Sequence, residues 1–269
     1  MTSIIAVIIF LGGLAAGFLT GLLGVGGGVV MVPVMYQVFL QLGESTKVAF
    51  TTAVATSLAV MIFSGLLAAH TYYQKGLLRL RLMAWSGAGT LLGASLGAHV
   101  MIATDDRVVR TAFGVFLWLA AASLFLPKAK SRPHDHVPGW GYNAGLLAVG
   151  TVMGMVSALF GVGGGALLVP ALVVLFGITI HNAVATSTAI IVLTAVFGTI
   201  NYLAIGWSDP NTPAHSLGWI HSLAWALLLP GALFATRAGV HTAMRLSREK
   251  LRLVLVLFQL MIGARFIFF

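Results

Sequence analysis

The stretch GLLGVGGGVVMVPVM, residues 21–35, places four glycines within five residues of an apolar segment. It lies in the run 3–42, which contains no charged side chain. Each glycine costs about 1 kcal/mol relative to alanine in a helix interior. The glycines therefore either interrupt a helix for a function or let another helix pack unusually close.

The same stretch returns in the second half of the chain. Residues 158–172 read ALFGVGGGALLVPAL, and 8 of the 15 positions match residues 21–35. The segment AVATS at 53–57 also returns, at 183–187. These repeats predict an internal duplication. We expect a first transmembrane repeat over 1–126, a cytoplasmic linker over 127–138 and a second transmembrane repeat over 139–269.

The composition excludes a soluble globular domain. The chain is 59% hydrophobic and 8% charged, whereas soluble domains carry about 25% charged residues. Uncharged runs of about 20 residues match the ~30 Å hydrocarbon core of a bilayer. We therefore predict an all-α polytopic membrane protein. Its net charge of +9 is concentrated in short loops, where it orients the chain and meets anionic lipid, so no nucleic-acid partner is expected.

Each half begins with one over-long, glycine-interrupted segment and continues with three ordinary spans. The predicted ranges are 3–42, 47–70, 78–102 and 107–126, followed by 142–180, 182–206, 219–241 and 249–268. The long segments are re-entrant or broken helices. Whether each is a re-entrant hairpin or a pair of short spanning helices stays open.

The basic residues favour a long segment that enters the membrane and returns. A single crossing would divide them 7 against 8, whereas a return divides them 11 against 4, as the positive-inside rule requires. The rich, cytoplasmic side then holds Lys75, Arg79, Arg81, Lys128, Lys130, Arg132, Arg237, Arg245, Arg248, Lys250 and Arg252. Both termini would lie outside. Each half crosses an odd number of times, which predicts two inverted repeats, the arrangement of secondary transporters.

The glycine motifs are the first candidate binding elements. A break followed by a new helix presents unpaired N–H groups and the positive end of a helix dipole, which suit an anion. The candidate substrate-binding glycines are Gly24, Gly26, Gly27, Gly28, Gly161, Gly163, Gly164 and Gly165. Close helix packing is the alternative explanation.

Polar residues near the motifs are the second set of candidates. The hydroxyls of Thr56, Ser57, Thr186 and Ser187 could donate to an oxyanion or bond to the carbonyl four residues back. Tyr72 and Tyr202 match across the repeats, and Asn201 precedes Tyr202. These tyrosines could line the permeation path or anchor the helices at the membrane interface. Arg237 could reach a ligand or extend to the headgroups.

The paired GVGGG-x3-VP elements, the AVATS segments and the two-half layout resemble the TauE/SafE sulfite exporter family over essentially the whole chain. The resemblance implies a secondary transporter, an exporter of small sulfur-containing anions such as sulfite or organosulfonates, in the bacterial inner membrane. An anion channel of the same fold is the alternative. We expect no enzymatic activity, cofactor or metal. The expected partners are the anionic substrate and the lipid bilayer, and a homodimer stays open.

Overall fold

The computed structural model describes residues 3–23, 26–123, 139–243 and 248–268. Within these residues the chain forms ten helices and one short hairpin, and six helices are long and apolar enough to cross a membrane. These six are α1 (Ser3–Leu23), α3 (Thr46–Gln74), α4 (Leu80–Ala103), α6 (Trp140–Phe160), α8 (Ile180–Gly206) and α9 (Ser222–Ala243). The predicted all-α class is confirmed, and the six helices agree with a multi-pass membrane protein.

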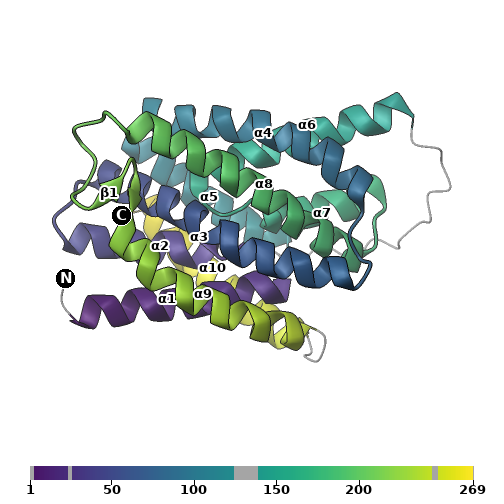
Figure 1. Cartoon of the computed structure of the whole chain (residues 1–269), viewed down its shortest axis with the longest axis horizontal. Coiled ribbons are helices and arrows are strands. Elements are labelled where there is room, and N and C mark those ends of the chain that lie inside the picture. Colours follow the sequence, from purple (N-terminus) through teal and green to yellow (C-terminus); the bar gives the residue numbers. More distant parts are fainter. Residues whose placement is uncertain (1–2, 24–25, 124–138, 244–247, 269) are drawn as a thin grey trace.

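The other helices are α2 (Gly28–Gln41), α5 (Asp106–Ser123), α7 (Gly165–Phe176) and α10 (Arg248–Phe268). Strands β1 (Ser216–Leu217) and β2 (Ile220–His221) form an antiparallel hairpin before α9. This hairpin, the start of α1 and the end of α10 lie at the same end of the bundle (Figure 1). The predicted linker over 127–138 falls outside the described residues.

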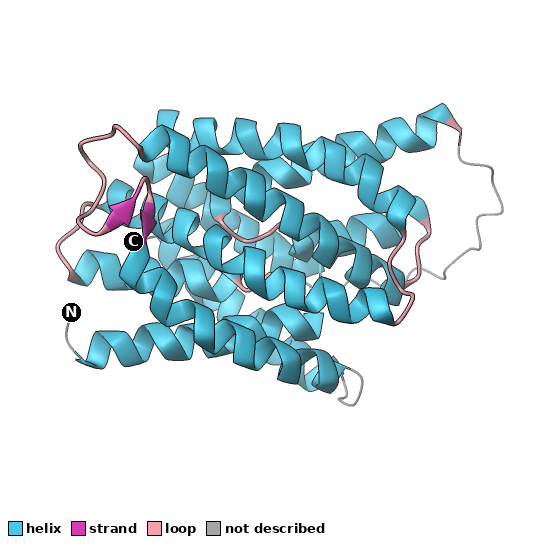
Figure 2. Ribbon diagram, in the orientation of Figure 1, coloured by secondary structure: helices cyan, strands magenta, loops and turns pink. Residues whose placement is uncertain are grey.

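Each predicted long segment is two helices that lie against one another. Gly12 in α1 faces the Val34 side chain in α2, and Gly27 faces Ala16, so the chain turns back after α1. In the second half the Tyr142 ring of α6 packs on the Phe176 ring of α7 at 5.2 Å. With 14 and 12 residues, α2 and α7 are only about 21 and 18 Å long. Both are half-helices that begin at short loops inside the bundle (Figure 2).

Two glycine-lined seams join the halves. Helix α1 packs along α9, and α4 packs along α6 (Figure 1). Glycines at every fourth position bring the backbones together, because they leave no side chain in the contact. Gly13, Gly17 and Gly21 face the backbone of Leu228, Ala232 and Thr236, and Gly89, Gly93 and Gly97 face that of Leu147, Thr151 and Met155. Both seams are parallel, since the residue numbers rise together.

Helices α3 and α8 occupy the centre, between the α1–α9 and α4–α6 pairs (Figure 1). They are antiparallel, since Gly65 faces Val192 and Gly198 faces Leu58. Their central positions explain why they are rich in uncharged small and polar residues, because protein rather than lipid covers most of their surface. This central pair supplies the walls of the site described below.

An aromatic cluster holds α2 in place. The Tyr36 ring lies 5.8 Å from Phe50 of α3 and 5.1 Å from Phe266 of α10. Phe113 of α5 is fully buried and contacts the rings of Phe50, Phe160 and Phe266 at 5.0 to 5.6 Å. The cluster therefore ties α2 to both central and outer helices.

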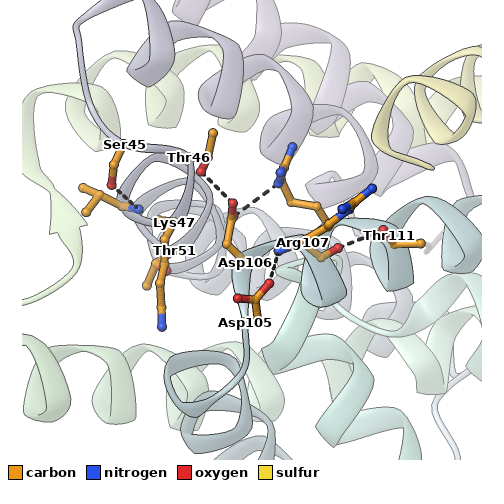
Figure 3. Close-up of polar contacts among 10 residues, drawn as sticks. Ser45, Thr46, Lys47, Thr51, Asp105, Asp106, Arg107 and Thr111 are labelled. Atoms are coloured by element: carbon orange, nitrogen blue, oxygen red, sulfur yellow. Dashed lines mark hydrogen bonds and ion pairs between the residues drawn. The ribbon is translucent and has the colours of Figure 1, made fainter. Parts of the chain in front are cut away.

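Polar contacts secure the same part of the bundle at its end. The Thr46 hydroxyl donates to Asp106 at 2.6 Å, and Lys47 donates to the Ile102 carbonyl at 2.9 Å. Asp106 also pairs with Arg110, and the Asp105 carboxylate accepts the Arg107 N–H at the start of α5 (Figure 3). These contacts fix the starts of α3 and α5 relative to one another.

Candidate functional site

The two glycine loops meet inside the bundle. A β-carbon on Gly28 would collide with the Gly161 carbonyl and lie 2.6 Å from the Val162 Cα. One on Gly26 would lie 2.5 Å from the Val162 carbonyl and 3.4 Å from the Gly163 Cα. We name this contact of Gly26, Gly28, Gly161 and Gly163 the glycine junction. It brings together four of the candidate glycines through their backbones.

The junction lies against the middle of the two central helices. Methionine Met61 of α3 places its Sδ 3.2 Å from a β-carbon position on Gly26 and 3.1 Å from one on Gly163. The side chain of Ile191 in α8 comes within 3.0 Å of the same β-carbon position on Gly163. Since α2 begins at Gly28 and α7 at Gly165, two helix N-termini start at one interior place. Their dipoles make this place favourable for a negative charge.

The two loops have different backbones. Gly26 and Gly163 occupy equivalent positions and both have a positive φ, of 77° and 80°. The next pair differs: Gly27 is right-handed helical with φ −70°, whereas Gly164 is left-handed with φ 67°. No side chain caps α2 or α7 at these residues. Gly24 lies outside the described residues.

The four hydroxyls of the two AVATS segments have three different hydrogen-bonding states. The hydroxyl of Ser57 donates to the Gly161 carbonyl at 2.9 Å and so belongs to the junction. Thr56 instead accepts the His221 N–H at 3.1 Å, and Thr186 accepts the Arg79 N–H at 3.2 Å. The threonines therefore hold the starts of α9 and α4, in equivalent ways. Ser187 is fully buried, and its hydroxyl has no partner.

The two tyrosine hydroxyls bond to the ends of the helices that lead into the glycine loops, and Asn201 bonds elsewhere. Tyr72 and Tyr202 are 8% and 0% exposed and donate to the carbonyls of Gly21 and Ala158, at 3.2 and 2.9 Å. These carbonyls lie in the last turns of α1 and α6, where the helix leaves carbonyls unpaired. Such burial does not suit an interfacial anchor. Asn201 donates to Ser95 of α4 and to the Phe197 carbonyl.

The immediate surroundings of the glycine junction are uncharged. The nearest neighbours of its glycines are uncharged side chains and backbone atoms. Arg237, which the sequence left as a candidate ligand, has an exposed side chain on α9. It lies beside Thr236, which is buried and bonds to the Ala232 and Gly17 carbonyls. The exposure agrees with an arginine that extends toward the headgroups.

Ser157 was not among the binding residues predicted from the sequence. This serine is 1% exposed, its hydroxyl has no partner, and its Cβ lies 3.3 Å from a β-carbon position on Gly164. A signal was available, because Ser157 matches Thr20 at the same offset as the glycine motifs. A hydroxyl therefore precedes both loops by the same number of residues.

Comparisons with known proteins agree over almost the whole chain. A family profile described as "Sulfite exporter TauE/SafE" matches residues 9–266. "Probable membrane transporter protein YunE" of Bacillus subtilis is 30% identical, with 97% of each chain covered. A "Probable membrane transporter protein" of Haemophilus influenzae is 25% identical, with 93% of this chain and 94% of the relative covered.

The match extends to an archaeon. A "Probable membrane transporter protein" of Methanocaldococcus jannaschii is 26% identical, over 90% of this chain and 88% of the relative. Among solved structures, none was found to match. The profile, the relatives and the membrane-length helices lead to one conclusion: the chain belongs to the sulfite exporter TauE/SafE family of membrane transporters.

Proposed function

We propose that this protein is a secondary transporter that exports small sulfur-containing anions, such as sulfite or organosulfonates, by alternating access around the glycine junction. The observation that carries the proposal is the meeting of two half-helix N-termini at one uncharged interior place. The family description supports the substrate class. Transport of this kind needs a site that two halves of the protein can open in turn.

The proposal includes two inverted repeats, and the helix directions support this. Equivalent helices α3 and α8 are antiparallel, as the contacts of Gly65 with Val192 and of Gly198 with Leu58 require. Helices α5 and α10 are antiparallel as well, since Gly114 faces Ile267 and Trp118 donates to the Leu260 carbonyl. Inverted halves can exchange conformations across the membrane.

The charge of the site sets the preferred substrate. Each helix N-terminus is equivalent to about +0.5 charge, and the nearest neighbours of the junction add no cation. Two such ends nearly compensate one negative charge and compensate two poorly. Burying an uncompensated charge costs many kcal/mol. Monoanions such as bisulfite or an alkanesulfonate therefore suit the site better than dianions.

Proteoliposomes test this function against the alternative, an anion channel. The purified protein is reconstituted with sulfite inside, and sulfite uptake is measured from a tracer outside. A secondary transporter gives saturable uptake that internal sulfite accelerates. Flux that rises linearly with concentration and is indifferent to internal sulfite would instead establish a channel.

We also propose that the β-hairpin end of the bundle faces outward from the inner membrane. The described cations Lys75, Arg79 and Arg81 lie at the end of α3 and the start of α4, at the opposite end of the bundle, which we expect to be cytoplasmic. The chain contains no cysteine, so single cysteines report orientation. Gly43 and Gly76 have open space at their β-carbon positions, and their φ values of 91° and 66° strain a side chain at both sites, so the two cysteine variants are matched. Gly43→Cys should react with an impermeant reagent in intact cells, and Gly76→Cys should not.

A further inference from the structure

The two halves differ in how their hydroxyl groups around the glycine junction are satisfied. In the first half Thr20 donates to the Ala16 carbonyl and Ser57 to the Gly161 carbonyl, both at 2.9 Å. The equivalent residues of the second half are Ser157 and Ser187. Their hydroxyls are buried, with residue exposures of 1% and 0%, and have no hydrogen-bond partner. Two paired hydroxyls thus correspond to two unpaired ones.

Ser157 lies beside the start of α7, and Ser187 lies one helical turn from a residue that contacts the same loop. The Cβ of Ser157 lies 3.3 Å from a β-carbon position on Gly164, the residue that precedes α7. Ser187 lies one turn before Ile191, whose side chain comes within 3.0 Å of a β-carbon position on Gly163. Residues four apart share a helix face, so Ser187 lies on the face of α8 that carries Ile191. Helix α7 has 12 residues and no side-chain cap at Gly164, and its first N–H groups have no partner within the helix.

Burying an unpaired hydroxyl destabilises a protein. Other serines and threonines of the described helices avoid this by bonding to the carbonyl four residues back, as Ser64 and Thr194 do, although Thr52, Ser86 and Thr199 are also buried without a partner. Ser157 and Ser187 do not. Unsatisfied buried groups in native proteins call for an explanation, of which binding is one. Two hydroxyl donors beside a helix N-terminus match a ligand made of acceptor oxygens.

We propose that Ser157 and Ser187 are the side-chain donors that bind the substrate oxyanion, so that the second glycine loop and α7, rather than both halves equally, hold the ligand. This inference rests on the proposed transport function and identifies the specificity residues of its site. The ligand class is a singly charged sulfur oxyanion, since its oxygens accept hydrogen bonds from hydroxyls and backbone N–H groups. In this arrangement the first half supplies a scaffold, with Ser57 fixing the shape of the loop.

The test compares three serine-to-alanine variants in the full-length protein. Ser157→Ala and Ser187→Ala remove the proposed donors. Ser86→Ala is the matched control, because Ser86 is equally buried and unpaired but lies in the α4–α6 seam, where its carbonyl faces Gly150. Sulfite binding at pH 6 is measured by tracer binding, and thermal unfolding is measured without ligand. Each donor variant should weaken sulfite binding by about tenfold or more, the value of a hydrogen bond to an anion.

The ligand-free unfolding temperature should stay unchanged or rise in all three variants, because each loses an unsatisfied hydroxyl. Wild-type affinity in both donor variants would overturn the inference and leave the proposed function standing. An equal loss of affinity in Ser86→Ala would also overturn it. Failure of the wild-type protein to bind or transport any sulfur oxyanion would remove the proposed function itself, and the inference with it.

Discussion

Helices α2 and α7 follow the same GVGGG sequence, yet they are packed differently in the structure. Ten of the 14 residues of α2 are buried, and aromatic rings from three other helices surround Tyr36 or its neighbour Phe50. In α7, Val174 and Leu175 are 55% and 63% exposed, and its described aromatic contact is Phe176 with Tyr142. The difference teaches that α2 is surrounded by the core, whereas α7 lies partly at the surface of the bundle.

The largest expected effect comes from a cavity in the aromatic cluster that packs around α2. Phe113→Ala deletes the ring that contacts Phe50, Phe160 and Phe266. We expect a loss of about 3 kcal/mol or more in the free energy of unfolding, because a cavity remains in the core. Phe176→Ala is the matched change within α7, where a single aromatic contact is lost, and should cost clearly less. Denaturant unfolding in detergent measures both, and equal losses would contradict the comparison.

The second largest effect is expected from adding a methyl group to a glycine of either loop. Gly28→Ala would press against the Gly161 carbonyl and the Val162 Cα, and overpacking of backbone costs about 1–3 kcal/mol. Gly164→Ala meets the Met153 carbonyl at 3.0 Å and must hold a φ of 67°, at about 1 kcal/mol or more. We therefore expect a lower unfolding temperature for Gly28→Ala than for Gly164→Ala. The reverse order would place the tighter contact in the second loop.

The smallest expected effect concerns the start of α9, where Thr56 accepts the His221 N–H. The His221 ring accepts the Ala224 N–H at 3.2 Å through Nδ1 and so caps α9. Burial, followed by the charge of His215, lowers the pKa of His221 below 6.5. Protonation favours the unfolded chain, so this stability is present above pH 6.5 and is lost as pH falls from 6.5 toward the lowered pKa.

A matched pair of variants isolates this titration. His221→Asn keeps a capping oxygen and cannot titrate, so its unfolding temperature between pH 5 and 8 should vary less than that of the wild type. His221→Ala removes the cap at every pH and should cost about 1 kcal/mol. An unchanged pH profile in His221→Asn would assign the acid sensitivity to other groups.

Much of this fold could be predicted from the sequence. The duplicated GVGGG and AVATS segments located both loops and the central helices, because apolar runs and glycine clusters are local signals. The partners of Gly13, Gly17 and Gly21 could not be predicted, since α9 lies in the other half of the chain. The unpaired state of Ser157 was equally hidden. The closeness of Ser157 to Gly164 is a contact across the loop, which no local sequence signal reports.

The central claim is that helix ends and hydroxyls, without a side-chain cation, hold one negative charge at the glycine junction. The most direct test measures the affinities of methanesulfonate, sulfite and sulfate for the purified wild-type protein from pH 6 to 8. We predict that methanesulfonate binds more tightly than sulfate throughout, and that sulfite binding strengthens toward pH 6, where bisulfite predominates, more than methanesulfonate binding does. Tighter binding of sulfate than of methanesulfonate would contradict the account, because a dianion would then require a cation that the junction does not contain.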